Sequence, residues 1–578
     1  MGSQLQPLDW IVLSATLLFI VVYGVYKTRK SDSGVQDYIK GGNDTKWWTI
    51  GLSVMATQAS AITFLSTPGQ AFHDGMGFVQ FYFGLPIAMV IICMVFIPIY
   101  YKLNVYTAYE YLESRFDLKT RSLAAFIFLI QRGLAAGITI YAPAIILSYV
   151  LGWDLITLNI IIGLIVIFYT VSGGTKAVNV TQKQQMIIIF SGMIIAFYLI
   201  MKYMPDGITF SKALEIAGAN DKMKVIDPTF DLNEKYTLWT GLIGGTFLML
   251  SYFGTDQSQV QRYLSGKSVR ESQLGLLFNG LLKVPMQFFI LLTGVMVFVF
   301  YQFNPSPLNF SPTANEAVIS SEYYDEYKQL EAEHAKIEEE KKTLVLDGVQ
   351  DGERALIAVL NKKDREIKKK GKAIIDMVAE TSDQKIQSND KDYVFIHFIL
   401  NNLPKGIVGL LLAVILAAAM SSTASELNAL ASTTTIDVYK RNVNQGKDEA
   451  HYVKASKLLT VGWGILSIII ACVADLFDNL IQLVNIIGSI FYGSVLGIFL
   501  LAFFFKFVKG NAVFLGGLVG QVIVILIYIF FIHIPEMNGE PPMLPYLMLN
   551  IIGALIVIAL SVLFQLIQPN KPSQELAA

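Results

Sequence analysis

Long apolar runs recur along nearly the whole chain and are separated by polar loops. A run of about 20 apolar residues is long enough to cross roughly 30 Å of hydrocarbon as an α-helix. A helix is required there because lipid offers no partner for backbone N–H and C=O groups. We therefore predict thirteen membrane helices, at approximately residues 9–26, 47–72, 78–102, 119–150, 154–172, 177–202, 236–257, 271–302, 404–438, 453–475, 479–505, 511–533 and 545–568.

One segment, residues 304–392, breaks this pattern because it is rich in charged side chains. Two stretches within it, Tyr323–Leu344 and Glu353–Glu380, have a helix-forming composition, and the Asp347-Gly348 sequence between them is typical of a turn. We predict an extracytoplasmic helical hairpin inserted between the eighth and ninth membrane helices. A spacer is the simpler interpretation of this insertion, and a docking site for a protein partner is the alternative.

Composition and charge agree with a chain that lies mostly in lipid. The 578 residues are 54% hydrophobic and only 15% charged, whereas soluble domains carry roughly 25% charged residues. We expect the lipid bilayer and no nucleic acid as a partner. Lysines and arginines gather in the short loops on one side, among them Arg115, Lys119, Arg121, Lys440 and Arg441. This asymmetry predicts a multi-pass protein of the plasma (inner) membrane, with the N-terminus outside and the C-terminus in the cytoplasm.

The residues that support other classes of function are sparse. Cys93 and Cys472 both lie inside apolar runs, so no disulfide framework or zinc spacing is indicated. The five histidines are dispersed along the chain and indicate no metal site. An enzyme in the membrane would need a nucleophile with a base, or a metal cluster, near one face. We find neither pattern and expect no catalytic residues.

Two of the predicted helices have polar interruptions. The second helix has a small and polar middle around Ala56–Ser60, followed by Pro68, and the seventh ends in Gly254 and Asp256. Interrupted helices at corresponding places in two halves of a chain point to the binding site of a transporter. Helices two and seven lie five apart, which predicts two five-helix repeats. Tight helix packing is the alternative explanation of the small residues.

The ninth helix carries Ser421, Ser422 and Ser425 within little more than one helical turn. Each hydroxyl can offer a lone pair to a cation, and sodium is suited to uncharged oxygen ligands. Carbonyl groups of an unwound second helix would supply the other ligands. The alternative is that the serines bond to carbonyls of their own helix.

Three segments resemble the sodium/solute symporter family, which includes the sodium/glucose cotransporters. They are Trp47–Ala61, Gly254–Ser265 and Ala418–Asn428, and the Thr-Asp-Gln…Val-Gln-Arg pattern of the second is the most specific. The resemblance covers nearly the whole chain except residues 304–392. It implies an all-α, polytopic membrane protein of about thirteen helices, with a five-plus-five inverted-repeat core containing broken helices, alternating access and a co-transported sodium ion.

The resemblance also implies ligands for sodium. Residue by residue, the main sodium site of the family maps to the carbonyls of Ala56, Ala59 and Ala418 and the hydroxyls of Ser421 and Ser422. Some members have a second site that uses an aspartate on the sixth helix and additional serines on the ninth. Gln182 and Ala424 stand at two of those positions here. We therefore predict one sodium ion per cycle.

The solute is a small polar molecule whose site is less well defined by the resemblance. Lys283 lies in the middle of a membrane helix, where a charged residue is costly and commonly functional; a structural pairing with Asp256 is the alternative. Lys283, Tyr252 and Asp256 match sugar-site positions of the family, while Thr63 and Tyr82 replace a glutamine and a glutamate. The candidate solute-binding residues are Thr63, Tyr82, Tyr252, Phe253, Asp256, Gln257, Lys283, Gln482 and Asn485.

A sugar or polyol is favoured as the solute, and a monocarboxylate or similar organic anion is the alternative, because the 257–263 run is similar to monocarboxylate and vitamin transporters of the family. A transporter-like sensor or a channel is the alternative of another class. A sensor would need a soluble output domain, and a channel would not need a closable solute pocket.

These expectations divide the chain into six segments. They are an N-terminal extra helix with a cytoplasmic loop (1–46), the first repeat with the start of the second (47–257), the second repeat continued (258–303), the hairpin insertion (304–392), the remainder of the second repeat (393–505), and peripheral C-terminal helices with a tail (506–578).

Overall fold

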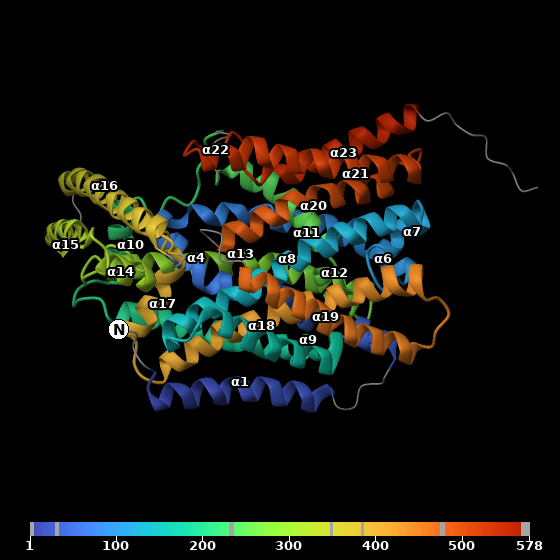
Figure 1. Ribbon diagram of the computed structural model, residues 1–578, viewed down its shortest axis with the longest axis horizontal. Coiled ribbons are helices and arrows are strands. Elements are labelled where there is room, and N and C mark those ends of the chain that lie inside the picture. The colour runs from blue at the N-terminus through green and yellow to red at the C-terminus, as the bar shows by residue number, and fades with distance from the viewer. Residues whose placement is uncertain are drawn as a thin grey trace, which may run out of the picture.

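The computed structural model describes residues 5–28, 34–230, 236–346, 351–382, 386–473 and 480–567. Most of its helices run along the long axis of the molecule, with α1 on one side and α21 and α23 on the opposite side (Figure 1). The turn predicted at Asp347-Gly348 lies outside the described residues.

The described residues are almost entirely helical. In chain order the elements are α1 (Pro7–Thr28), α2 (Val35–Lys40), η1 (Gly41–Asn43), α3 (Trp47–Gln58), α4 (Ala61–Asp74), η2 (Gly75–Tyr82), α5 (Leu85–Ile91), η3 (Ile92–Phe96), α6 (Ile97–Leu103), α7 (Glu110–Arg115), α8 (Leu118–Leu151), α9 (Leu155–Lys202), α10 (Phe210–Ala219), η4 (Thr240–Gly244), α11 (Gly245–Gly254), α12 (Gln257–Leu264), α13 (Val269–Phe300), α14 (Pro312–Ile319), α15 (Tyr324–Leu346), α16 (Asp351–Thr381), α17 (Lys391–Asn402), α18 (Ile407–Thr433), η5 (Thr434–Val443), α19 (Glu449–Val473), α20 (Leu480–Phe504), α21 (Gly510–Tyr528), η6 (Ile529–His533), α22 (Ile534–Met537) and α23 (Met548–Ile567).

Ten helical segments of the described chain are long and apolar enough to cross a membrane. Three places account for the difference from thirteen predicted runs. The predicted runs 47–72 and 78–102 are replaced by one span, residues 61–103, because helical elements follow one another from α4 to α6, although Gly75 at the end of α4 has φ 77° and ψ −159°. The element α9 likewise includes both predicted helices 154–172 and 177–202, which meet at the non-helical Gly174 (φ 54°, ψ −156°). The predicted run 236–257 is divided into η4, α11 and α12, so that its apolar helix covers only Thr240–Gly254.

The second predicted helix is interrupted at Ala59 and Ser60, between α3 and α4. Ala59 has φ −83° and ψ 75°, and Ser60 has φ −75° and ψ 173°, so both residues leave the helical conformation. The same break recurs between α11 and α12, where Thr255 and Asp256 are non-helical. Each break exposes backbone groups that a continuous helix would satisfy internally.

The interrupted helices lie inside a layer of long helices. α13 packs along α3 and α4, and α18 packs against α8 and α9. α11 contacts α20, which also packs against α8. The breaks are therefore buried at the centre of the molecule, where a polar group needs a partner from another element.

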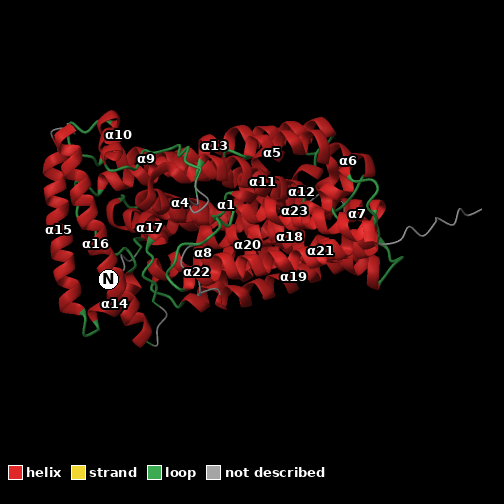
Figure 2. Cartoon of the chain, turned by 90° about the horizontal axis from the view of Figure 1, so that it is seen from above, coloured by secondary structure: helices red, strands yellow, loops and turns green. Residues whose placement is uncertain are grey.

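The charged insertion contains the short helix α14 and two long helices, α15 and α16, that pack side by side across one end of the bundle (Figure 2). They have a small apolar core of their own, which includes Tyr327, Leu330 and Ile374. His334 of α15 and Asp364 of α16 are joined by a 2.6 Å contact between Nδ1 and Oδ1. The insertion thus has its own polar and apolar contacts beyond the ends of the long helices.

Candidate functional site

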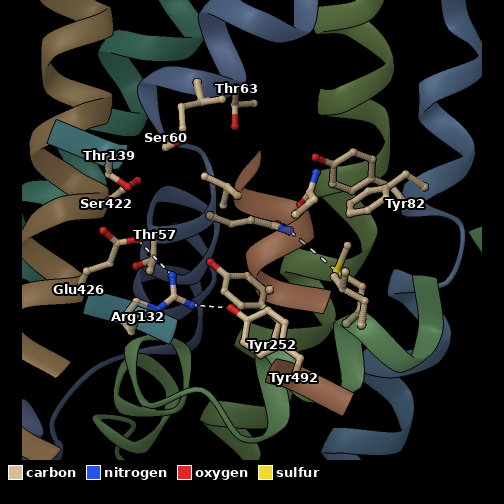
Figure 3. Close-up of a pocket in the computed structure, with 18 residues that line it drawn as sticks. Thr57, Ser60, Thr63, Tyr82, Arg132, Thr139, Tyr252, Ser422, Glu426 and Tyr492 are labelled. Carbon is tan, nitrogen blue, oxygen red and sulfur yellow. Dashed lines mark hydrogen bonds and ion pairs between the residues drawn. The ribbon is translucent and has the colours of Figure 1, made fainter. Parts of the chain in front are cut away.

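A pocket opens beside the break between α3 and α4 (Figure 3). It is bounded by α4, η2, α8, α11, α18 and α20, and it contains about 730 Å³ of empty space, including the part that is continuous with solvent. Its lining residues are Thr57, Gln58, Ser60, Ile62, Thr63, Phe81, Tyr82, Arg132, Thr139, Leu248, Met249, Tyr252, Ser422, Glu426, Val484, Asn485, Gly488 and Tyr492.

Four of the nine candidate solute-binding residues line this pocket: Thr63, Tyr82, Tyr252 and Asn485. The other five, which are Phe253, Asp256, Gln257, Lys283 and Gln482, lie outside its lining. The amide of Gln257 is used to hold the chain near α7, because its Oε1 accepts from the Ala108 N–H (3.1 Å) and its Nε2 donates to the Tyr106 carbonyl (3.0 Å).

Asp256 belongs to a charged cluster that borders the pocket. Its Oδ2 receives a hydrogen bond from Nη2 of Arg132 and another from the Tyr492 hydroxyl at 3.0 Å. Its Oδ1 accepts from the backbone N–H (2.9 Å) and hydroxyl (2.7 Å) of Ser258. The break between α11 and α12 places Asp256 at the N-terminus of α12. From there its carboxylate binds Arg132, and Asp256 does not line the pocket.

Lys283 is fully buried on α13, and its Nζ has no hydrogen-bond partner among the described residues. The interpretation of Lys283 as a structural partner of Asp256 is wrong, because Asp256 is bonded to Arg132. The Nζ atom lies 5.9 Å from the ring centroid of Tyr82, which does line the pocket. The amine therefore lies near a lining residue while Lys283 itself is outside the lining.

Three of the five predicted sodium ligands, Ala56, Ser421 and Ser422, meet where α18 passes the broken helix. The Ser421 hydroxyl donates to the carbonyl of Ala56 at 3.2 Å, and the Ser422 hydroxyl reaches the same carbonyl at 3.5 Å. Ala59 is at the break itself, and Ala418 is fully buried on α18 just before the two serines. Uncharged oxygens from two separate elements are thus brought together at one buried point.

Gln182, on α9, is the residue that the resemblance matches to the aspartate of a second sodium site in some members of the family. Its Nε2 donates to Ser425 Oγ (2.7 Å), Thr57 Oγ1 (3.0 Å) and the Ser421 carbonyl (3.3 Å). Its Oε1 accepts from the hydroxyl of Ser53. An amide nitrogen therefore fills the centre of this second oxygen cluster.

Sequence reasoning missed the residues that give the pocket its charge, namely Arg132 and Glu426, together with their partner Tyr492. A signal was present for the first two, because each is an ionisable residue within an apolar helix, and such residues are commonly functional. Across the described chain no group of three His, Cys, Asp or Glu side chains could hold a metal ion. Any cation in the core therefore depends on uncharged oxygens or on these carboxylates.

Several known proteins resemble this chain in sequence, and a solved structure resembles it in fold. The sequence profile of the sodium:solute symporter family matches residues 38–321 and 373–520. A sodium/sialic acid symporter, SiaT, of Proteus mirabilis (strain HI4320) is 26% identical over 90% of this chain and 89% of its own. The mouse sodium-coupled monocarboxylate transporter 2 is 27% identical, with 89% and 71% covered. The human sodium/iodide cotransporter is 31% identical, but the match spans only 51% of this chain and 45% of the relative.

A solved structure of a Na⁺-coupled sialic acid symporter in a substrate-bound, outward-open state superposes with a TM-score of 0.73 and 24% identity. It covers 97% of this chain and 98% of that chain. This likeness confirms the predicted all-α, polytopic fold with an inverted-repeat core. The profile match shows that the chain belongs to the sodium:solute symporter family and is a sodium-coupled solute symporter rather than an enzyme.

Proposed function

We propose that this symporter imports a small polar organic solute, with a sugar or polyol favoured, together with one sodium ion. The observation that carries the proposal is the contact of Ser421 and Ser422 with the Ala56 carbonyl beside the break in the second helix. Ser422 also lines the solute pocket. One residue therefore belongs to both the cation cluster and the solute cavity, and this arrangement supports direct coupling.

The sodium ligands we propose are the carbonyls of Ala56, Ala59 and Ala418 and the hydroxyls of Ser421 and Ser422. A bound ion would tie the α3–α4 break to α18 and order one wall of the pocket. Ordering by a first ligand lowers the entropic cost for the second, which gives positive cooperativity between sodium and solute. Closure of the outer path and opening of the inner path then release both ligands inside.

One ion per cycle is supported by the Gln182 network, since an amide nitrogen already donates to Thr57, Ser425 and the Ser421 carbonyl. One charge moved through a membrane potential contributes about 2.3 kcal/mol per 100 mV. A tenfold sodium gradient adds about 1.4 kcal/mol. Together these sustain a solute accumulation of roughly several hundred-fold.

The alternative solute is a monocarboxylate or similar organic anion, which the names of the sialic acid and monocarboxylate relatives support. A sensor or channel role is the alternative of another class. We further propose a plasma-membrane location with the N-terminus outside, and the six-segment organisation with residues 304–392 as an extracytoplasmic insertion. A protein partner on that insertion remains a proposal.

Uptake into proteoliposomes tests the proposed function. We expect accumulation of a radiolabelled solute only with an inward sodium gradient, and faster uptake when a potassium diffusion potential makes the lumen negative. Replacement of sodium by choline should abolish accumulation. Downhill flux that is independent of sodium would indicate a channel, and sodium binding without solute movement would indicate a sensor.

A further inference from the structure

Arg132 lines the pocket, and Figure 3 shows its guanidinium group joined to Glu426 and to the Tyr492 hydroxyl. Nη1 donates to Glu426 Oε1 at 3.1 Å, and Nη2 donates to Asp256 Oδ2 and to the Tyr492 hydroxyl at 2.6 Å. A solute carboxylate is recognised best by the two parallel donors of a free arginine fork. In this pocket the protein's own acids occupy both Nη atoms of Arg132, and only its Nε has no partner among the described residues.

The two carboxylates bound to Arg132 differ in whether an oxygen remains free to accept a hydrogen bond from a solute. Both oxygens of Asp256 accept hydrogen bonds, and Asp256 does not line the pocket. Glu426 lines the pocket with 5% of its surface exposed, and its Oε2 has no hydrogen bond of good geometry from a described residue, although the Thr139 hydroxyl lies close to the carboxylate. The nearby Thr139 hydroxyl donates instead to the Ala135 carbonyl at 3.0 Å. A buried carboxylate oxygen without a donor is rare in folded proteins and indicates a place for a ligand group.

The charged groups at the pocket also carry an excess of negative charge. One guanidinium faces two carboxylates, and Lys283, a buried lysine near the pocket, lies outside the lining, with its Nζ 5.9 Å from the ring centroid of Tyr82. Glu426 follows Ser422 by four residues on α18, so their side chains lie on the same face of the helix, one turn apart. A sodium ion at Ser421 and Ser422 would therefore lie near the Glu426 carboxylate and offset the excess negative charge.

We propose that Glu426 determines the solute class: its free oxygen accepts a hydrogen bond from a hydroxyl of an uncharged, polyhydroxylated solute, and its charge excludes a carboxylate while favouring sodium next to Ser422. This inference rests on the proposed function and narrows it to neutral solutes. Relatives named for monocarboxylates and sialic acid transport anions. The pocket of this chain has instead an internal anion at the position from which the arginine would meet such a solute.

Matched pairs of ligands that differ only in charge test this inference on the purified full-length protein. The probes are sorbitol and gluconate, glucose and glucuronate, and glycerol and glycerate, each titrated in a thermal-unfolding assay with and without sodium. For the wild-type protein we expect stabilisation by at least one neutral probe only when sodium is present, and none by its anionic counterpart. Equal binding of the anionic member, or no binding by either class, would overturn the inference.

Glu426→Gln keeps the size of the side chain and removes its charge. We expect about tenfold weaker sodium binding, which is about 1.4 kcal/mol. We also expect about tenfold weaker binding of the neutral probe and new binding of its anionic counterpart. Unchanged sodium affinity and unchanged selectivity would contradict the proposal. Asp437→Asn is the matched control, because Asp437 is also a buried acid paired with an arginine, Arg121, at 2.7 Å, but it does not line the pocket. It should alter stability without altering selectivity.

A second variant tests the same proposal if Glu426→Gln does not fold. Glu426→Asp keeps the charge but withdraws the carboxylate by one methylene group, so sodium affinity should stay within about twofold while the neutral probe is lost. Failure of the proposed function has a different signature: if sodium itself does not stabilise the wild-type protein, the sodium-coupled mechanism is wrong irrespective of solute class.

Discussion

Two oxygen clusters lie close together where α3 and α9 meet α18, and they differ in what completes them. In one, the hydroxyls of Ser421 and Ser422 converge on the Ala56 carbonyl. In the other, Thr57 and Ser425 approach each other to 3.1 Å between their hydroxyl oxygens, and the Gln182 amide nitrogen donates to both. The two clusters share an element, α18, and a buried setting.

This difference indicates how many cations the core can take. Convergent lone pairs in a buried site are unfavourable unless a donor or a cation satisfies them. Gln182 supplies the donor through a covalently attached N–H group, and no ion is needed there. The Ala56 cluster has only two hydroxyl protons for its oxygens, and we propose that sodium completes it.

The largest expected effect comes from converting the satisfied cluster into an ion site. Gln182→Asp removes the donor and adds a buried negative charge, which should cost about 3–5 kcal/mol of stability in sodium-free buffer. Sodium should restore much of this loss by binding beside the new carboxylate. In proteoliposomes the coupling ratio, measured from the reversal potential, should rise from one sodium ion per solute to two. Gln182→Asn, which shortens the amide without adding charge, is the control and should keep the ratio at one.

Ser422→Ala should have the next largest effect. It changes the cluster around the Ala56 carbonyl, to which the Ser422 hydroxyl belongs. The loss of one proposed ligand should raise the sodium concentration for half-maximal uptake about tenfold, or about 1.4 kcal/mol. Stability without sodium should change little, because the hydroxyl makes only a 3.5 Å hydrogen bond to the protein. Sodium titrations of uptake and of thermal stability measure the two effects separately. An unchanged sodium requirement would remove Ser422 from the site.

Ser425→Ala should lower the stability of the protein slightly and leave its sodium requirement nearly unchanged, which is the opposite of the result expected for Ser422→Ala. The Gln182 amide would lose its shortest acceptor, at 2.7 Å, and a lost hydrogen bond of this type costs about 1 kcal/mol. The sodium requirement should change less than twofold, because the donor of the second cluster remains in place. A tenfold change in the sodium requirement would mean that Ser425 is itself an ion ligand and that the clusters are not distinct.

The smallest effect is expected outside the membrane core, in the α15–α16 insertion. Burial opposes the charged form of His334, but hydrogen bonds to Asp364 and Glu338 raise its pKa above the ordinary value. Burial likewise disfavours the charged form of Asp364, yet Lys368 and His334 lower its pKa. The stabilising contribution of His334 is therefore complete below its unfolded pKa and is lost as the pH rises through its folded pKa.

Hydrogen exchange in α15 and α16 should accordingly become a few fold faster between pH 6 and pH 9, after correction for intrinsic rates, which is less than about 1 kcal/mol. His334→Gln should remove this dependence. Exchange in α18 should be insensitive to the same substitution. If α18 responded equally, the insertion would be coupled to the core rather than separate from it.

The fold and the uncharged cluster were accessible from the sequence because their signals are local. The small polar run before Pro68 and the serines of α18 each lie within a few turns of one helix, and their pairing follows from the family resemblance. The extents of α15 and α16 follow from composition in the same way. The boundary between the predicted helices 154–172 and 177–202 was accessible as well, because it falls at Gly174, whose φ of 54° and ψ of −156° interrupt α9.

The charged part of the pocket was not accessible in this way because its members are distant in the sequence. Arg132 is separated from Asp256 by 124 residues and from Glu426 by 294 residues. The place of Lys283 in the middle of its helix correctly indicated a buried amine. The sequence alone could not distinguish an ion pair with Asp256 from a position near the Tyr82 ring without an ion pair. Only the packing of α8, α12 and α18 decides which ions pair.

Equilibrium binding of radioactive sodium to the purified full-length protein tests the central claim most directly. The account predicts saturation at one ion per chain, retention of that ion in Ser425→Ala, and its loss over the same concentration range in the Ser421→Ala/Ser422→Ala double variant. Saturation at two ions, or one ion bound equally well by the double variant, would contradict it.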